Sequence, residues 1–242
     1  MAERTLKFGD ITREPDIRML YDMKEVVWDR SWLRDADNMP LYYMYRDLML
    51  EKHRQAIKGA KARYDITVMP PNTLGKEYVK TKGHYHPEAA PGVSYPEIYE
   101  VIQGEAHYLL QRKEENEVTD VIVVEAEAGD KVIIPPNYGH ITINPSDTEL
   151  RMANWVSRKF ESIYEDITEK RGGVYYETTD GEFVENDHYD QVPELRRRKP
   201  VQVPDLGITN DKPMYKMIQD PDNLAFLNKP QNFGWVFEQV VG

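Results

Sequence analysis

The sequence predicts a mainly β fold, in which short antiparallel strands form a sandwich or barrel between an N-terminal arm with a helix and a C-terminal extension. From residue 62 onward the period is two, as in Tyr64, Ile66 and Val68 of ARYDITVMP, which is the pattern of a half-buried strand. Turn-forming sequences such as EAGD, PPNYG and NPSD then separate further short strands. This spacing favours an all-β architecture over a βαβ fold.

The expected strands follow one another closely along the chain. Gly104 divides two of them as a hairpin or a sharp corner, and Asp180-Gly181 is typical of a tight hairpin turn. A short helix is expected over residues 158–171. The strands themselves are expected at residues 76–80, 97–103, 105–111, 118–126, 130–134, 139–144 and 149–156.

We expect three parts in the chain. Residues 1–60 would be an arm and a helix that pack on the barrel, and residues 61–190 would be the barrel itself. Residues 191–242 are too apolar in PMYKMI, LAFL and FGWVFEQVV for a disordered tail, so we expect an extension docked on the body or on a partner subunit. The helix of the arm is expected over residues 38–59 and has an apolar stripe made of Leu41, Tyr45, Leu48 and Ile57.

The composition limits the classes of partner. The 242 residues carry a formal net charge of −11, whereas nucleic acids and anionic membranes require clustered Lys and Arg. The basic run RRRK at 196–199 is short, so we expect a solvated loop or an ion-pairing segment. There is no cysteine, no apolar run of about 20 residues and no signal-like apolar stretch in residues 1–20. We therefore expect a soluble cytoplasmic protein without disulfides.

Three histidines and one glutamate indicate a metal site. The side chains of His84 and His86 point to the same face if their segment is extended, while the Pro- and Gly-containing stretch 87–96 allows Glu97 to return beside them. His140 follows the PPNYG turn on a separate strand. Any single His is more often an ordinary polar residue, but the combined pattern favours one divalent transition metal per subunit. The donors suit Fe²⁺, Mn²⁺, Ni²⁺, Co²⁺ and Zn²⁺, of which we expect Fe²⁺ first.

Two further histidines are rivals for this site. His107 shares the predicted hairpin with the metal-site segment, but it lies after Gly104 on the return strand. We expect it on the surface or behind the ligands. His188 follows the last predicted hairpin and has no partner nearby in the sequence, so we expect an ordinary polar role.

Residues 81–104 and 129–144, which contain the four candidate ligands, resemble the two sequence motifs of the cupin family. The resemblance implies a small antiparallel jelly-roll barrel, and the stretch 87–96 is longer than the corresponding gap in the family. Asn137 also replaces a usual glycine. The first motif corresponds to His84, His86, Glu97 and Gly104, and the second to Gly129, Pro135, His140 and Asn144.

TKGHYH at 81–86 is the most specific part of a closer resemblance, to the cupin-type phosphoglucose isomerases of archaea, which covers about residues 60–190. It implies interconversion of glucose 6-phosphate and fructose 6-phosphate in glycolysis and gluconeogenesis. Glu97 would be the candidate base and Tyr99, on the same face of its strand, would reach the same cavity. The resemblance assigns the metal to His84, His86, Glu97 and His140, and the substrate and its phosphate to Thr67, Thr81, Gly83, Tyr99 and Tyr164.

The match weakens after residue 150, where Val156 and Ser162 replace a Tyr and a His of the family. Three other functions remain open from the sequence. A cupin dioxygenase would use a similar metal site, a sugar-binding cupin would have no turnover, and a related isomerase would act on mannose 6-phosphate. By analogy with cupin barrels, which commonly pair, we expect a homodimer.

Overall fold

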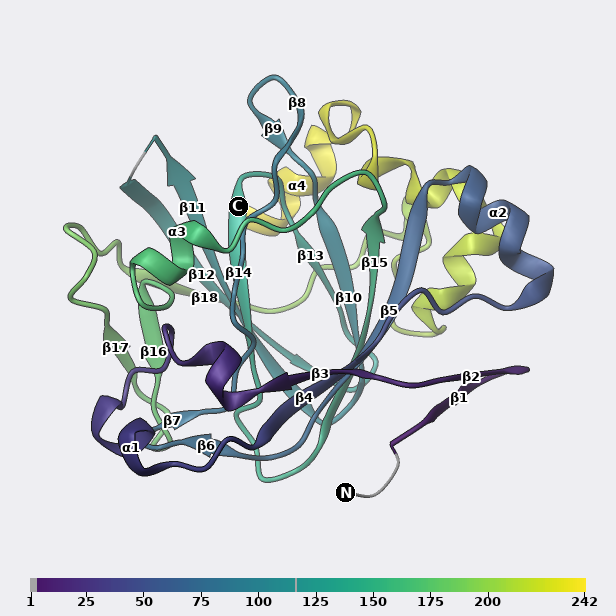
Figure 1. Ribbon diagram of the computed structural model, residues 1–242. Helices are drawn as coiled ribbons and strands as arrows, with labels where there is room; N and C mark the ends of the chain where they lie inside the picture. Colours follow the sequence, from purple (N-terminus) through teal and green to yellow (C-terminus); the bar gives the residue numbers. More distant parts are fainter. Residues whose placement is uncertain (1–3, 116) are drawn as a thin grey trace.

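Two β-sheets face each other across a barrel interior in the computed structural model, which describes residues 4–115 and 117–242 (Figure 1). The expected mainly β barrel is confirmed. The six-stranded sheet has the order β13 (Lys131–Ile134), β10 (Glu97–Gln103), β15 (Leu150–Ser157), β5 (Ala62–Met69), β4 (Pro40–Tyr45) and β3 (Asp16–Met19). The four-stranded sheet has the order β14 (Tyr138–Ile143), β11 (Glu105–Glu114), β12 (Glu117–Glu127) and β18 (Leu195–Arg198).

Smaller elements decorate the rims and the outer faces of the two sheets. Four two-stranded pairs are β1 (Leu6–Phe8) with β2 (Ile11–Arg13), β6 (Thr73–Leu74) with β7 (Glu77–Tyr78), β8 (Glu88–Ala90) with β9 (Val93–Ser94), and β16 (Tyr175–Glu177) with β17 (Phe183–Glu185). The α-helices are α1 (Arg30–Asp35), α2 (Arg54–Gly59), α3 (Glu165–Glu169) and α4 (Gly234–Val241). Short 3₁₀ segments are η1 (Leu20–Met23), η2 (Glu51–His53), η3 (Pro204–Leu206), η4 (Met214–Gln219), η5 (Pro221–Leu227) and η6 (Pro230–Asn232). Across the described ranges, none of the helices has the length and apolar content that crossing a bilayer requires.

Gly104 forms a corner between the two sheets, not a hairpin. β10 lies in the six-stranded sheet and β11 in the four-stranded sheet, and the two strands do not pair. Gly104 has φ +80°, and a Cβ atom there would lie 2.8 Å from the carbonyl oxygen of Glu149. Only glycine fits this turn without displacing β15. The expected late hairpin at Asp180-Gly181 is present and joins β16 to β17.

The prediction of a helix over residues 38–59 is wrong for the first half of this range. Residues 40–45 form strand β4, which pairs with β3 on one side and with β5 on the other, and only residues 54–59 form an α-helix. The run LYYMY is rich in aromatic residues, which favour strands, and both of its faces are largely buried. A short run that is apolar on both faces cannot be assigned to helix or strand by periodicity alone.

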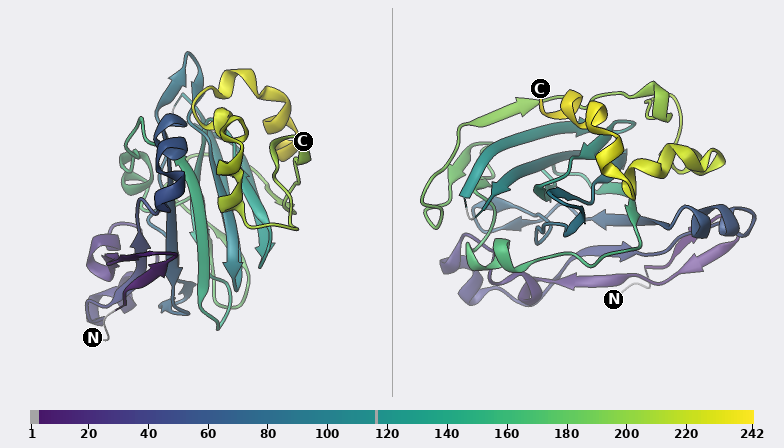
Figure 2. Two further views of the ribbon diagram at one scale, coloured as in Figure 1. Left: turned by 90° about the vertical axis from the view of Figure 1, so that its right-hand side faces the viewer. Right: turned by 90° about the horizontal axis from the view of Figure 1, so that it is seen from above.

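The C-terminal segment covers the outer face of the six-stranded sheet, so that the sheet that carries Glu97 is buried on both sides. Figure 2 shows this segment against the sheet. Trp155 donates a hydrogen bond from Nε1 to the carbonyl oxygen of Met214 at 3.1 Å, and the backbone N–H of Met214 donates to Glu100 at 2.9 Å. The tail residues in this core are Val203, Leu206, Ile208, Met214, Met217, Ile218, Leu224, Phe226, Leu227, Val236, Phe237 and Val240.

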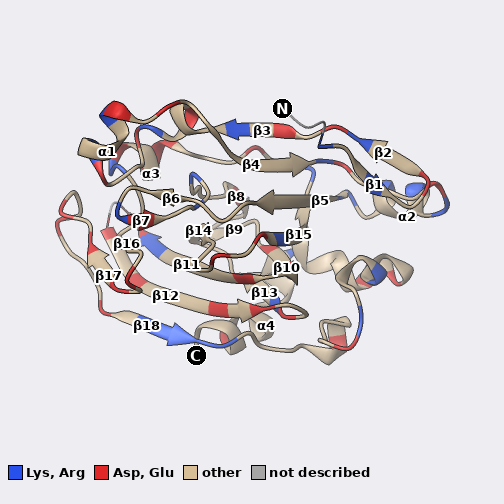
Figure 3. Cartoon of the chain, turned by 90° about the horizontal axis from the view of Figure 1, so that it is seen from below, with Lys and Arg blue, Asp and Glu red and all other residues tan. Residues whose placement is uncertain are grey.

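The basic run at 196–199 contributes to the four-stranded sheet. Residues up to Arg198 form β18, which pairs in parallel with β12, so the alternative of a solvated loop is wrong and the alternative of ion pairing is confirmed. Arg196 pairs with Asp120 at 2.6 Å, and Lys199 pairs with Glu125 at 3.1 Å. Figure 3 shows the basic β18 beside acidic positions of β12.

Candidate metal centre

The four predicted metal ligands meet between the two sheets. His84 and His86 lie in an extended segment that is held to β14 by isolated bridges, one of which joins His84 to His140. The backbone N–H of His140 donates to the carbonyl oxygen of His84 at 3.0 Å, and the return bond measures 3.3 Å. Glu97 is the first residue of β10 in the opposite sheet. The barrel therefore brings together donors that are up to 56 residues apart in the sequence.

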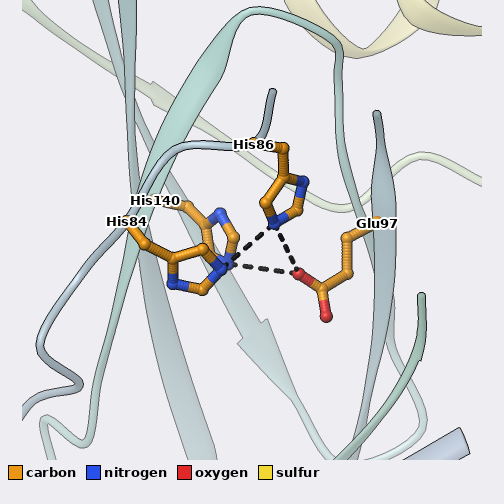
Figure 4. Close-up of side chains that lie close together, drawn as sticks. All are labelled: His84, His86, Glu97 and His140. Atoms are coloured by element: carbon orange, nitrogen blue, oxygen red, sulfur yellow. Dashed lines mark hydrogen bonds and ion pairs between the residues drawn. The ribbon is translucent and has the colours of Figure 1, made fainter. Parts of the chain in front are cut away.

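The donor atoms of these side chains converge on one point (Figure 4). Nε2 of His84 lies 3.1 Å from Nε2 of His86, and Oε2 of Glu97 lies 3.4 Å from Nε2 of His86 and of His140. One ligand atom from each of the four residues lies within 4.8 Å of all the others. Such a group can hold a single ion.

The chemistry of this donor set fits a cation. Nδ1 of His86 lies 2.8 Å from the carbonyl oxygen of Tyr95, and because a carbonyl only accepts, Nδ1 carries the proton. In the neutral ring Nε2 of His86 then presents a lone pair to Nε2 of His84 and to the Glu97 carboxylate. Lone pairs that face one another at 3–3.5 Å repel, whereas a metal ion among them would be bound by all of them.

The environment favours the protonation states that a metal requires. Burial lowers the pKa of His140 to about 4 and, together with His140 and His86, lowers the pKa of His84 well below its ordinary value. Burial alone would raise the pKa of Glu97, but the neighbouring His86 and His140 lower it. Neutral imidazoles and an ionised carboxylate are the forms that coordinate a divalent ion.

Two polar groups contact Glu97 and His140. Asn154 on β15 donates from Nδ2 to Oε1 of Glu97 at 2.6 Å, which leaves Oε2 directed to the imidazoles. The hydroxyl of Tyr99 lies 3.1 Å from Nε2 of His140. Burial, followed by the charge of Glu97, raises the pKa of Tyr99 well above its ordinary value. Tyr99 is therefore a neutral phenol that can donate a hydrogen bond.

A cavity of about 460 Å³ opens over the four ligands. It is large enough for a small phosphorylated sugar. Every residue that the sequence assigned to the metal or the substrate lines this cavity, and so do Val156 and Ser162. The assigned residues are Thr67, Thr81, Gly83, His84, His86, Glu97, Tyr99, His140 and Tyr164.

The residues that the sequence assigned to the phosphate all line the cavity. Oγ1 of Thr81 accepts a hydrogen bond from the backbone N–H of Thr142 at 2.9 Å, so its hydroxyl proton remains available as a donor. Gly83 has φ +78°, and a Cβ atom there would lie 2.5 Å from Cγ1 of Ile141. Glycine is thus required by packing, and its position keeps the backbone at the cavity wall.

The rival histidines lie elsewhere, as expected. Nδ1 of His107 lies 2.8 Å from Glu177, and His107 does not line the cavity. His188 lies beside Asp187 at 3.7 Å, and both side chains are exposed. Neither histidine belongs to the group of four.

Sequence reasoning missed several residues of the site, above all the cations. The residues assigned to the phosphate from the sequence include no cation, yet Arg18, Arg46, Arg63 and Lys82 line the cavity. Phe160 also lines it, with its ring centroid 4.5 Å from that of His86. The stretch 87–96, expected as a loop, carries the β8–β9 pair and the Tyr95 carbonyl that orients His86. Backbone carbonyls have no sequence signature.

Part of the chain is similar to known proteins. Residues 17–194 match the family model described as Glucose-6-phosphate isomerase (GPI). The glucose-6-phosphate isomerase of Thermococcus onnurineus (strain NA1) is 38% identical over 93 residues, which are 38% of this chain and 45% of that protein. The glucose-6-phosphate isomerase of Thermococcus litoralis is 30% identical over 136 residues, which are 54% of this chain and 63% of that protein. The chain thus matches less than two thirds of the length of these relatives.

Among solved structures, the Lactobacillus farciminis oxalate decarboxylase formate complex is similar with a TM-score of 0.38 and 17% identity, over 51% of this chain and 31% of that one. A likeness at this level adds no argument to the fold described above. The family model, in contrast, spans more than half of the chain and includes all four candidate metal ligands. The chain therefore belongs to the glucose-6-phosphate isomerase (GPI) family.

Proposed function

We propose that this protein is a metal-dependent aldose–ketose isomerase that interconverts glucose 6-phosphate and fructose 6-phosphate. The observation that carries the proposal is the convergence of His84, His86, Glu97 and His140 on one point at the wall of a sugar-sized cavity, in a chain of this family. Three imidazoles and one carboxylate leave coordination positions for a substrate on a divalent ion.

The phosphate of the sugar would occupy the wall formed by residues 81–83. We assign it to the Thr67 and Thr81 hydroxyls, the backbone N–H of Gly83, and the hydroxyls of Tyr99 and Tyr164. All of these residues line the same cavity as the metal ligands, and hydroxyl and amide donors can together coordinate a dianion. This arrangement would hold the sugar between its phosphate and the reacting C1–C2 end.

The reaction moves one hydrogen between C1 and C2 of the open-chain sugar. A bound divalent ion would supply Lewis-acid polarisation of the sugar oxygens. Glu97 is the carboxylate of the site. Asn154 donates a hydrogen bond to one of its oxygens at 2.6 Å, so the other oxygen is available to the metal ion or to a proton. Tyr99, kept neutral by burial, would donate a hydrogen bond to the sugar or its phosphate. The tilted ring of Phe160 beside His86 would limit the access of water.

Two routes for the hydrogen are distinguishable. In an enediol route Glu97 takes a proton from C2 and returns it to C1, so protons can exchange with solvent on the enzyme. In a hydride route the hydrogen moves directly, and Glu97 acts only as a ligand. Isomerisation of fructose 6-phosphate in D₂O, followed by mass spectrometry of the product, separates the routes, because only the enediol route incorporates deuterium.

We further propose Fe²⁺ as the bound ion, a homodimer as the functional form and the cytoplasm as its location. The donor set suits Fe²⁺ and also accepts Mn²⁺, Ni²⁺ or Zn²⁺, so metal analysis of the purified protein is the test. The open edge of β3 and the exposed Ile17 and Tyr21 support pairing of two chains. A solution mass near 28.3 kDa would contradict the dimer.

The deciding experiment measures glucose 6-phosphate formation from fructose 6-phosphate with chelator-stripped protein, before and after addition of Fe²⁺ or Mn²⁺. Activity that disappears on stripping and returns with metal supports the proposal. Absence of activity with either ion refutes it, and oxygen consumption would then identify a dioxygenase. Product analysis with mannose 6-phosphate in the same assay distinguishes the related isomerase.

A further inference from the structure

Arg18 differs from the other cations of the cavity because it has no ion-pair partner. Arg46 lies 3.1 Å from Asp16 and 3.6 Å from Asp65, Arg63 lies 2.9 Å from Asp65, and Lys82 lies 3.7 Å from Glu25. For Arg18, no carboxylate among residues 4–115 and 117–242 lies within ion-pair distance, and its Nε atom is buried without a hydrogen-bond acceptor. A buried donor without a partner costs free energy, and in a chain of net charge −11 a free guanidinium is unexpected.

Arg18 lies where its unpaired charge can meet a ligand in the cavity. Arg18 lies on β3, at the edge of the six-stranded sheet, directly opposite Tyr42 of β4, so the two side chains project from the same face and both line the cavity. The hydroxyl of Tyr42 accepts a hydrogen bond from the backbone N–H of Lys82 at 3.3 Å. Lys82 lies between Thr81 and Gly83, the positions to which the phosphate is assigned above. Arg18 and Tyr42 thus line the cavity beside the segment to which the phosphate is assigned.

We infer that Arg18 binds the phosphate dianion of the substrate and sets the specificity of the cavity for phosphorylated over unphosphorylated sugars. The inference rests on the proposed function for the sugar and for the place of its phosphate. A guanidinium offers a planar fork of N–H donors that matches two phosphate oxygens. The groups assigned to the phosphate above are neutral hydroxyl and backbone donors, and Lys82 between them is already paired with Glu25 at 3.7 Å. Within the described part of the chain, Arg18 is therefore the cation of the cavity whose charge is not offset by a carboxylate within ion-pair distance.

The test uses inorganic phosphate as the probe and compares two variants of the full-length, metal-loaded protein. Arg18→Gln removes the free charge, and Arg46→Gln removes a charge from the same cavity that is already paired with Asp16 and Asp65. We expect the Kd for phosphate, measured by calorimetry, to rise about 10- to 100-fold in Arg18→Gln. In Arg46→Gln we expect a change of less than about threefold, since a neutralised charge contributes little. Equal weakening in both variants, or none in Arg18→Gln, would overturn the inference.

Kinetics with fructose 6-phosphate provide a second, independent measurement. Arg18→Gln should raise KM by a similar factor and leave kcat within about threefold, because the lost contact is present in the ground state and the transition state alike. Arg18→Lys should recover part of the affinity, since an ammonium acts as a point charge without the fork. Metal content and circular dichroism of each variant check that the fold is retained.

Failure of the proposed function and failure of this inference give different results. Wild-type protein that binds phosphate through Arg18 but does not isomerise fructose 6-phosphate would refute the isomerase and support the role of Arg18. Wild-type protein that isomerises the sugar, with Arg18→Gln indistinguishable from Arg46→Gln, would support the isomerase and overturn the role of Arg18.

Discussion

Nδ1 of His86 donates a hydrogen bond to the backbone carbonyl oxygen of Tyr95 at 2.8 Å, and this bond selects the tautomer that directs the Nε2 lone pair to the candidate metal. Tyr95 ends the hairpin of β8 and β9, and its ring stacks on Phe160 at a centroid distance of 4.8 Å. The stretch that is long relative to the cupin motif therefore contributes an outer contact of the metal centre. Such contacts orient a ligand and increase metal affinity.

Replacement of residues 88–94 by a short Gly-Ser linker should weaken the metal site. Without the hairpin the Tyr95 carbonyl is no longer held against His86, so we expect metal affinity to fall about 10- to 100-fold while the barrel remains folded. Titration of the stripped protein with Mn²⁺ measures this. Tyr95→Phe is the matched control, because it keeps the carbonyl and the ring, and its affinity should remain that of the wild type.

Removal of one direct ligand should have a larger effect. His140 is 2% exposed and supplies one of four converging donors, so His140→Ala should lower metal affinity by more than about 100-fold, beyond the loss of an outer contact. Activity should be lost together with the metal. His107→Ala is the control, since His107 pairs with Glu177 outside the cavity, and it should retain one ion per chain by mass-spectrometric metal analysis. Stoichiometric metal in His140→Ala would remove this residue from the site.

Glu97→Gln tests the central carboxylate with little change of shape. The amide can still accept from Asn154, but it lacks the charge that holds the ion and the basicity that an enediol route requires. We expect kcat to fall about 10²- to 10⁴-fold. The assay should be run at saturating Fe²⁺ or Mn²⁺, so that weaker metal binding is compensated. A kcat within tenfold of the wild type under these conditions would show that Glu97 is not required for the reaction.

The ion pair between Asp120 and Arg196 should make part of the stability dependent on pH. Burial would raise the pKa of Asp120, but hydrogen bonds from Arg196 and Tyr138 lower it below its ordinary value. A lowered pKa in the folded state means that the stabilisation is present above the unfolded-state pKa of about 3.9 and is lost as the pH falls further. At pH 7 we expect Asp120→Asn to cost about 0.5–1 kcal/mol in free energy of unfolding, since the pair is partly exposed and screened.

Urea unfolding of the wild type and of Asp120→Asn at several pH values checks this expectation. The difference between the two proteins should be constant from pH 7 to about pH 5 and should shrink below about pH 4. Asp190→Asn is the control, because the Asp190 side chain is 96% exposed and should give no such trend. A difference that grows on acidification would contradict the assigned direction.

The docked C-terminal segment should contribute strongly to stability. Phe226 is fully buried against the outer face of the six-stranded sheet, so Phe226→Ala should cost about 3–5 kcal/mol through lost burial and a residual cavity. Trp235 of the same segment is 44% exposed, and Trp235→Ala should change the free energy of unfolding by no more than about 0.5 kcal/mol. Equal effects of the two substitutions in urea unfolding would show that the segment does not dock as described.

The sequence was most informative where chemistry and spacing coincide. The pair His84 and His86, the return to Glu97 and the turn before His140 predicted that these four side chains meet, and the structure brings their ligand atoms within 4.8 Å of one another. Strand β5 could be predicted from alternation, because Asp65 and Thr67, which face the cavity, separate Tyr64, Ile66 and Val68. Strand β4 could not, because its aromatic and apolar run has no such alternation.

Arg18 was missed for a different reason. It lies 66 residues before His84 in the sequence, and only the pairing of β3 with β4 brings it to the cavity. Contacts of this kind depend on strand order, which residue periodicity does not encode. The same holds for Asn154, whose contact with Glu97 follows from the pairing of β15 with β10.

The strand order of the six-stranded sheet also has a consequence for how the protein matures during synthesis. All four metal donors have been translated once residue 140 is complete, but β10 is joined to β5, β4 and β3 only through β15. The N-terminal strands β3, β4 and β5 can pair early, but they are joined to β10, which carries Glu97, only after β15 has been made. We therefore expect metal loading on the ribosome to be premature and the cavity, with Arg18 in place, to be one of the last features that a newly made chain acquires.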